Sequence, residues 1–203
     1  MYSLYDKAFY FISGHGRGWA FSANDLLAKF SSQQADNVLS DLLKDGKIRR
    51  VCRGIYDYPK YSEFLKQELS PDIDQVARAF ARKFNWRIEV LGDTALNMLG
   101  LSTQVVAKYV YLSDGPNRSY DILGTTLEFK KSSLKNIGFK YKESSLIVQA
   151  LKTLGKERVT EEVIETIRKR IEPKMYAKIL KDTQSSTVWI YEAIKQICRG
   201  IDG

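Results

Sequence analysis

The stretch SANDLLAKFSSQQADNVLSDLLKDGKIRRVCRGIYDY, residues 22–58, carries the pattern that decides the N-terminal fold. Its apolar side chains recur at i, i+3, i+4, i+7 and i+8, which is the spacing of one face of an α-helix. They are Ala35, Val38, Leu39, Leu42 and Leu43. We expect this helix to stop at Gly46, because glycine tolerates the left-handed conformation of a helix C-cap.

The opposite face of the expected helix is polar. It consists of Gln33, Asn37, Ser40 and Lys44, flanked by Gln34 and Asp41. Amides and hydroxyls both donate and accept hydrogen bonds, and Asn or Gln can make a bidentate contact to adenine. This face therefore suits the base edges of a nucleic acid.

A basic β-hairpin is expected directly after the helix. Its turn falls near Gly54, and Ile48 and Ile55 are its expected inward anchors. Its cationic residues are Lys47, Arg49, Arg50 and Arg53. Upstream, Trp19 to Phe21 are expected to form a short strand that pairs with this hairpin, and Ser22 is a suitable N-cap for a preceding helix.

This order of elements predicts a winged helix-turn-helix, with one helix in a DNA groove and the hairpin along the phosphates. The candidate DNA-binding residues are Arg17, Gln33, Gln34, Asn37, Ser40, Lys44, Lys47, Arg49, Arg50 and Arg53. The competing interpretation is a small helix-turn-helix core whose polar face is only solvated, since amphipathic helices that end in glycine are common.

The composition favours an acidic partner and disfavours several kinds of chemistry. A net charge of +8 over 203 residues points to nucleic acid first and to acidic protein surfaces second. A single histidine, His15, argues against His-dependent metal sites and a Ser-His-Asp triad. Cys52 and Cys198 match no metal-ligand spacing, and the Gly14–Gly18 run lacks the ending of a P-loop. We expect no metal and no cofactor.

The chain shows no sign of membrane insertion or export. No stretch reaches about 18 uncharged apolar residues, which is the length that a transmembrane helix requires. The N-terminus lacks the basic segment of a signal peptide, and Asp6 and Lys7 precede its short apolar run. A cytoplasmic location is expected.

Beyond the N-terminal domain, expected at residues 1–60, residues 61–203 are expected to form a mixed α/β domain with C-terminal helices, so the fold class is α/β (α+β). Residues 60–69 suggest a linker or a short connecting helix. Ser70-Pro71-Asp72 has the features of a helix start, with a cap, a proline at the first helical position and an acidic first turn, and the buried face of this helix is expected to extend to Phe84. Strands are expected at 87–91, 108–112, 119–123 and 125–131, with a strand or loop at 135–142. Besides residues 2–13, helices are expected near 73–84, 94–99, 144–154, 160–171 and 186–199.

Four blocks resemble the AbiEi-type antitoxins of type IV toxin–antitoxin systems. They are GRGWAFSANDLL (16–27), LLKDGKIRRVCRGIYDYP (42–59), GDTALNMLGLSTQ (92–104) and VYLSDGPNRS (110–119). The similarity runs from about Arg17 to Arg170 and is strongest over Ile48–Pro59 and Leu99–Arg118.

The resemblance implies an N-terminal winged helix that binds double-stranded DNA at its own promoter and represses it. It also implies a C-terminal domain that counteracts a nucleotidyltransferase-like toxin, and a protein that is not an enzyme. The DNA contacts carried over fall on Gln33, Gln34, Asn37, Ser40, Arg49, Arg50 and Arg53. No chemistry is carried over to the matching C-terminal positions, which include Asp93, Asn97, Ser102, Thr103, Asp114 and Arg118.

Three alternatives remain open at the level of sequence. A stand-alone winged-helix regulator without a toxin partner would show the same blocks. A Mg²⁺-dependent nuclease could use Asp121 or Asp114 with Glu128 and Lys130, an E-x-K arrangement, although E-x-K also arises by chance in a Lys-rich strand. A protein-interaction module could use the basic outer faces of the C-terminal helices, where Trp189 is either a core residue or an interface anchor.

Overall fold

The computed structural model describes residues 3–102, 108–132 and 138–199. These residues combine α-helices with three β-sheets, so the fold is of the mixed α and β class. The chain forms two compact units. Unit 1 comprises residues 1–87 and 119–127, and unit 2 comprises residues 88–118 and 128–203.

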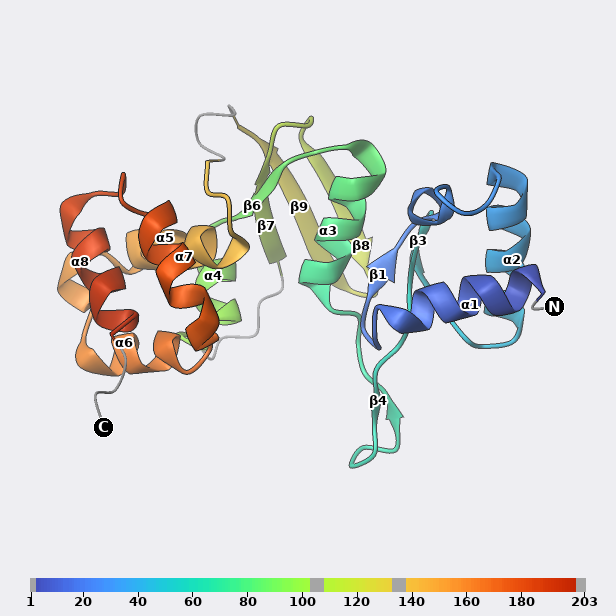
Figure 1. Cartoon of the computed structure of the whole chain (residues 1–203), viewed down its shortest axis with the longest axis horizontal. Helices are drawn as coiled ribbons and strands as arrows, with labels where there is room; N and C mark the ends of the chain where they lie inside the picture. The colour runs from blue at the N-terminus through green and yellow to red at the C-terminus, as the bar shows by residue number, and fades with distance from the viewer. Residues whose placement is uncertain (1–2, 103–107, 133–137, 200–203) are drawn as a thin grey trace. The chain divides into compact units, whose positions relative to one another are not determined.

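Unit 1 begins with two helices that pack against each other and a small sheet (Figure 1). Helix α1 (Leu4–Gly14) is followed by β1 (Ala20–Phe21), the 3₁₀ turn η1 (Ala23–Leu26) and α2 (Ser32–Lys44). Strands β2 (Arg49–Cys52) and β3 (Ile55–Asp57) form the hairpin, and β1 pairs with β3 to give the order β1-β3-β2. The expected pairing of the upstream strand with the hairpin is therefore confirmed. The helix expected after Ser22 is only one 3₁₀ turn.

Helix α2 forms because one of its faces completes the core of unit 1. Ala35, Leu39 and Leu42 are at most 1% exposed and pack with Ile12 and Phe21. At its start, Ser31 and Gln34 form a capping box, which satisfies two amide groups that lack helical partners. Past its end, Gly46 adopts φ 63°, in the left-handed region that favours glycine. The C-terminal end agrees with the sequence prediction to within about two residues.

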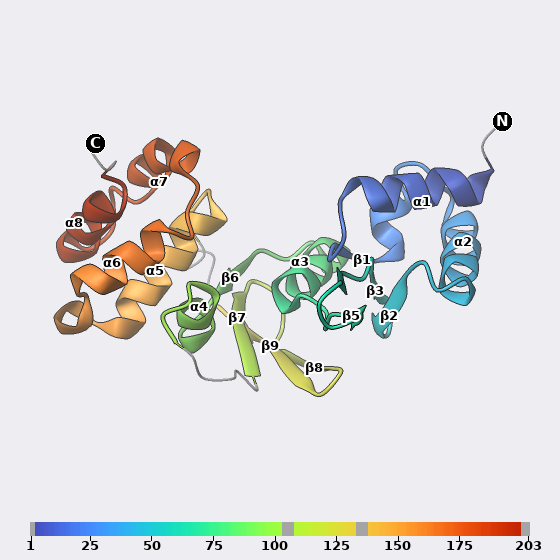
Figure 2. The same cartoon turned by 90° about the horizontal axis from the view of Figure 1, so that it is seen from below.

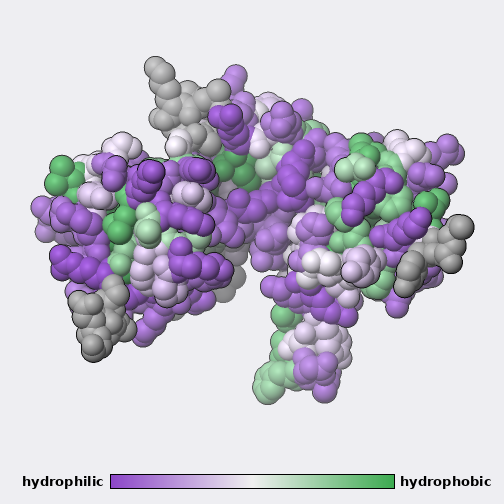
Figure 3. All heavy atoms as spheres, viewed as in Figure 1, coloured by the Kyte–Doolittle hydropathy of each residue, from purple (hydrophilic) through white to green (hydrophobic). Residues whose placement is uncertain are grey.

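Residues 60–69 form a hairpin, not the expected linker or short helix. Strands β4 (Tyr61–Ser62) and β5 (Gln67–Glu68) pair with each other alone. The turn is closed by the Ser62 hydroxyl, which accepts a hydrogen bond from the amide of Leu65. Figure 3 shows apolar surface at the end of this hairpin, where Phe64 is 93% exposed. Two-residue strands are too short to show alternation in the sequence, which explains why the hairpin was not predicted.

Helix α3 (Ile73–Phe84) belongs to unit 1, so the division between the units differs from the expected boundary near residue 60. The Arg82 guanidinium donates to Asp25 Oδ1 at 2.6 Å and to the carbonyl of Ala20 at 2.7 Å. The side chain of Asn24 donates to the carbonyl of Lys83. These tertiary bonds, and the packing of α3 on β1, β3 and η1, attach the helix to the N-terminal elements.

Two details of α3 differ from the sequence prediction. Asp72 is the N-cap and accepts from the amide of Gln75, so Pro71 precedes the cap instead of occupying the first helical position. Phe84, expected on the buried face, is 43% exposed. Its ring stacks on Trp86 instead, with 4.7 Å between the ring centroids.

Unit 2 starts with β6 (Ile88–Val90), α4 (Asp93–Met98) and β7 (Lys108–Ser113). Strands β8 (Arg118–Ile122) and β9 (Thr125–Lys131) belong with β6 and β7 to a four-stranded sheet of the order β6-β7-β9-β8, although residues 119–127 of these two strands are part of unit 1. These strands match the predicted positions to within about two residues. Thr103 and residues 133–137, part of the expected strand or loop at 135–142, lie outside the described residues, as does the expected helix start at Tyr2.

The C-terminal helices of unit 2 form one cluster (Figure 2). Helix α5 (Lys142–Leu154) buries Ile147, Val148 and Leu151 and packs on α4, β6, α7 and α8. It is followed by η3 (Lys156–Arg158), α6 (Glu161–Arg168), η4 (Pro173–Met175), α7 (Tyr176–Asp182) and α8 (Val188–Ile197). Helix α7 was not predicted, because Ile179 is its only buried side chain. None of the described helices has the length and hydrophobicity that a membrane crossing requires.

A buried carboxylate on β6 makes the stability of unit 2 depend on pH. Burial raises the pKa of Glu89 above its usual 4.5, although hydrogen bonds from the Phe139 and Gly138 amides act in the other direction. Between the unfolded and the folded pKa the native state binds more protons than the unfolded chain, so stability falls as pH rises through that window.

We therefore predict that Glu89→Gln flattens this dependence. Between pH 4.5, the usual pKa, and neutral pH, the unfolding midpoint of the variant should fall less than that of the wild type. The exposed Glu157, changed to Gln, is the matched control and should follow the wild-type profile. Parallel profiles for all three proteins would contradict the assignment.

Candidate nucleic-acid interface

The exposed face of α2 presents a row of polar side chains. Gln33, Asn37 and Ser40 are all exposed and stand at i, i+4 and i+7, so they follow one line along the helix. The buried residues Ala35, Leu39 and Leu42 lie on the other side. Lys44 continues the row and lies 3.5 Å from Asp41, an exposed pair that adds little to stability. The side chains of the row are thus available to a partner.

Gln34 has a second role that the sequence prediction did not assign. Its Oε1 accepts from the backbone amide of Ser31, so its carbonyl is used in the capping box. The start of α2 is held in this way, while α1 holds its end: Tyr5 donates from its hydroxyl to Asp45 Oδ2 at 2.6 Å. This hydrogen bond raises the pKa of Tyr5 to about 12. The helix that carries the polar row is therefore fixed at both ends.

The β2–β3 hairpin carries two exposed arginines. Cys52 pairs with Ile55, which leaves Arg53 and Gly54 as the two turn residues, and Gly54 has φ 75°. Val51 and Ile55 face the interior, whereas Arg50 and Arg53 are exposed. Neither arginine makes an ion pair with a residue that the structure describes. Both guanidinium groups can therefore reach an anion.

Arg49, in contrast, is partly buried and has a structural role. Its Nη2 lies 2.6 Å from Asp57 Oδ2 and its Nε 3.0 Å from Oδ1, which is a bidentate pair across β2 and β3. Nη1 donates to the carbonyl of Leu69 at 3.1 Å. The Asp57 side chain is 2% exposed, and burial raises its pKa although Arg49 lowers it. Arg49 therefore neutralises a buried carboxylate, and we do not assign it to phosphate binding.

Two further candidate residues are placed beside aromatic rings. The Arg17 guanidinium lies 4.7 Å from the centroid of the Tyr58 ring and donates to the carbonyl of Pro59 at 2.9 Å. Lys47 is exposed, with its ammonium 5.8 Å from the Phe9 ring centroid. Arg17 is held at the hairpin base by these contacts, while Lys47 keeps an exposed charge between α2 and β2.

One basic residue near the hairpin was not predicted. The ammonium of Lys83, from α3, lies 3.4 Å from the carbonyl of Gly54 and supports the turn. Its charge, with that of Arg50, lowers the pKa of the Cys52 thiol, but burial has the larger effect and raises it. Lys83 is 29 positions away from Gly54 in the chain, so local patterns could not have revealed the contact.

Two of the residues considered for a nuclease site, Glu128 and Asp121, have other partners. Glu128 Oε2 lies 2.7 Å from the Lys108 ammonium. Asp121 accepts from the amide of Gly124 across the β8–β9 turn, and Lys130 is exposed. Across the described ranges, no group of three or more His, Cys, Asp or Glu side chains could hold a metal ion.

A family model described as "Family of unknown function (DUF6088)" matches residues 10–179, most of the chain. The chain belongs to this family. The matched range includes α2, the β2–β3 hairpin and the four-stranded sheet β6-β7-β9-β8. Among curated proteins, no sequence matches. The crystal structure of the RV2827C protein from Mycobacterium tuberculosis is similar over 98% of this chain and 77% of that one, with 10% identity and a TM-score of 0.42.

Proposed function

We propose that residues up to about Pro59 are a winged helix that reads duplex DNA. The observation that carries this proposal is one pairing: the exposed row Gln33, Asn37 and Ser40 on α2, followed by a hairpin with exposed Arg50 and Arg53. Amide side chains on a helix suit base edges in the major groove, and arginines beside it suit phosphates. The net charge of +8 is opposite in sign to the charge of DNA and therefore favours their association.

We infer further that the protein is a cytoplasmic transcriptional autorepressor and acts as the antitoxin of a type IV toxin–antitoxin pair. The support for this role is the resemblance of the blocks at 16–27, 42–59, 92–104 and 110–119 to AbiEi-type antitoxins. In this proposal unit 2 opposes a nucleotidyltransferase-like toxin and the protein is not an enzyme. The ion pair between Glu128 and Lys108 argues against the nuclease alternative, since it occupies the carboxylate that would bind Mg²⁺.

The test is a fluorescence-anisotropy titration of the purified protein with its own upstream DNA and with a scrambled duplex, at two salt concentrations. We expect tighter binding to the upstream DNA, with a preference that survives at the higher salt. Contacts to phosphates weaken steeply with salt for both duplexes. Contacts to base edges maintain the difference in affinity between the upstream and the scrambled duplex. Weak and equal binding that disappears with salt would contradict a sequence-reading regulator.

Asn37→Ala is expected to reduce the preference more than the affinity for scrambled DNA. Asn37 is central in the exposed row, and a bidentate base contact contributes about 1–3 kcal/mol of discrimination, or roughly 5- to 150-fold. The ratio of the two dissociation constants measures the effect. Gln67→Ala removes an exposed amide from β5 of the same unit and should leave the ratio unchanged. If the ratio of dissociation constants is the same for both variants, Asn37 does not contact the bases and the sequence preference arises from another surface.

A further inference from the structure

A short segment of unit 2 without regular structure is held by two carboxylates. The amides of Gly138 and Phe139 donate to Glu89 Oε1 at 2.9 and 3.4 Å. The next two amides, of Lys140 and Tyr141, donate to Asp182 Oδ1 and Oδ2, both at 3.0 Å. Four consecutive backbone donors are thus satisfied by side chains from β6 and α7. This anchoring holds the backbone from which the Phe139 side chain extends, and a binding site needs such support in order to be preorganised.

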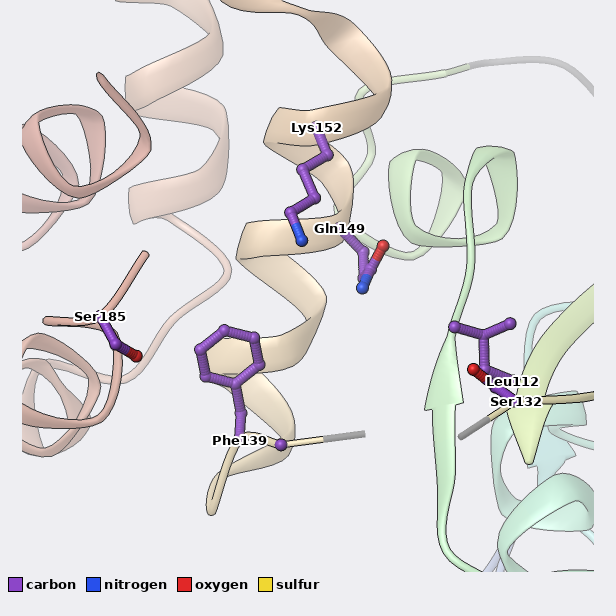
Figure 4. A pocket seen from close by; sticks show the side chains of 7 residues that line it. Leu112, Ser132, Phe139, Gln149, Lys152 and Ser185 are labelled. Atoms are coloured by element: carbon purple, nitrogen blue, oxygen red, sulfur yellow. The ribbon is translucent and has the colours of Figure 1, made fainter. Parts of the chain in front are cut away.

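Phe139 forms one side of a pocket of about 580 Å³ within unit 2 (Figure 4). This volume lies in the range of small-molecule sites. Besides Gly138 and Phe139, the lining residues are Leu112, Ser132, Gln149, Lys152 and Ser185. The side chains combine an aromatic ring, an amide, hydroxyls and one ammonium group, and none of them is a carboxylate. The composition of the pocket therefore suits an anion with a planar apolar part.

Gln149 is the most informative residue of the lining. It is 8% exposed, and its side-chain amide makes no hydrogen bond among the contacts of the described residues. Its amide points into the pocket in Figure 4. The amide group of Gln149 is not among the buried side-chain groups that lack a partner, which fits an amide that faces the open space of the pocket. An amide both donates and accepts, so a ligand with a donor and an acceptor at this position would pair with it.

Lys152 places a positive charge beside this amide. It stands three residues after Gln149 on α5, and both side chains extend into the same space, with Phe139 to one side and Leu112 and Ser132 to the other (Figure 4). Lys152 makes no ion pair with a described residue, and the acidic group that its charge influences is Glu89. One oxygen of Glu89 is already used by the Gly138 and Phe139 amides. The ammonium group of Lys152 is therefore available to a phosphate.

We propose that this pocket binds a nucleoside monophosphate. The ring of Phe139 would stack on the base, as aromatic side chains do on unstacked bases. The Gln149 amide would pair with the donor and acceptor at the edge of the base, and Lys152 would bind the phosphate as a point charge. The ring, the amide and the ammonium group thus match the face of the base, the edge of the base and the phosphate of a nucleotide. The proposal concerns unit 2 alone and does not depend on DNA binding by unit 1.

The test is isothermal titration calorimetry of the full chain with the four ribonucleoside 5′-monophosphates. The partial probes are ribose 5-phosphate and the nucleoside of the nucleotide that binds. We expect at least one nucleotide to bind, and each partial probe of it to bind at least about tenfold more weakly, because each lacks one of the charged or stacking contacts. Absence of binding by all four nucleotides at millimolar concentration would overturn the proposal.

Three variants locate the site. Lys152→Ala should weaken nucleotide binding about tenfold or more while leaving binding of the matching nucleoside unchanged, since it removes only the phosphate contact. Gln149→Leu should weaken both. Lys156→Ala removes an equally exposed charge from η3 and should change neither. Binding should also persist when Arg50 and Arg53 are replaced by alanine; a loss there, or equal effects of Lys152→Ala and Lys156→Ala, would assign the nucleotide to another site.

Discussion

Replacing Arg49 by alanine is expected to lower the free energy of unfolding of unit 1 by about 3 kcal/mol, the low end for breaking a buried ion pair. The reason is the carboxylate that remains. Asp57 is 2% exposed, and both of its oxygens accept from the Arg49 guanidinium. Without Arg49, Asp57 would be a buried charge with no cationic partner. The arginine also donates to the carbonyl of Leu69, so the base of the β4–β5 hairpin loses a bond.

The pH dependence gives this prediction a second, independent readout. Burial already raises the pKa of Asp57, and Arg49 lowers it, so removing the arginine should raise it further. A carboxyl group with a raised folded pKa loses stability as pH rises from its unfolded pKa through its folded one. The Arg49→Ala variant should therefore differ least from the wild type at acidic pH and most at neutral pH.

The measurement is urea unfolding followed by tryptophan fluorescence in a Trp189→Phe background, where Trp19 and Trp86 remain and both lie in unit 1. Arg53→Ala, on the same hairpin but exposed, is the control and should stay within about 0.5 kcal/mol. Adding Asp57→Asn to Arg49→Ala should recover part of the loss, because the buried charge is then gone. Equal stabilities of the Arg49 and Arg53 variants would refute the structural role.

The role of Arg49 illustrates what a local pattern reveals and what it does not. Counting cations after α2 identified Arg49, Arg50 and Arg53 together. The register of β2 on β3 places Arg49 opposite Asp57. Only this register shows that Arg49 has a structural role, whereas Arg50 and Arg53 are exposed. The sequence did contain a signal: an arginine and an aspartate at nearly equal distances from the turn at Gly54. That signal has meaning only once the hairpin and its one-residue irregularity between Arg50 and Cys52 are known.

The elements predicted most accurately are those whose cause is local. Helix α2 follows from the spacing of Ala35, Val38, Leu39 and Leu42, and the hairpin turn follows from Gly54, which adopts a positive φ. The β4–β5 hairpin and α7 were missed because each buries little apolar surface of its own. The attachment of α3 depends on Arg82 reaching Asp25 and Ala20 across more than 50 positions, which no periodicity encodes.

The candidate sites show the same contrast. The exposed row on α2 is readable from the sequence, since it is the complement of a buried stripe. The pocket of unit 2 is not, because it depends on Glu89 and Asp182 holding residues 138–141. Neither acid stands near that segment in the chain. A single sequence shows them only as two charged residues among many.

The largest functional effect is expected from replacing Arg50 and Arg53 together by alanine. Each exposed guanidinium can bind one phosphate, and a hydrogen bond to a charged group contributes about 1.5–3 kcal/mol. The double variant should therefore bind DNA about 100-fold more weakly at low salt. The loss should be equal for upstream and scrambled duplexes, because phosphate contacts carry no sequence information directly. The double arginine variant should thus lower the affinity for both duplexes, whereas Asn37→Ala should mainly lower the preference for the upstream duplex.

The dependence on salt distinguishes lost contacts from a general change of charge. Two phosphate contacts fewer should reduce the slope of log K against log salt by about 1.8, at about 0.9 for each contact. Lys169→Ala with Lys181→Ala removes the same two charges from exposed positions of unit 2. If the lysine control lowers the affinity and the slope as much as the arginine variant does, DNA is attracted by the overall positive charge of the protein. The β2–β3 hairpin would then not be a specific phosphate contact. If only the arginine variant changes both, the β2–β3 hairpin is the phosphate contact, since the two proteins differ only in where the charges stood.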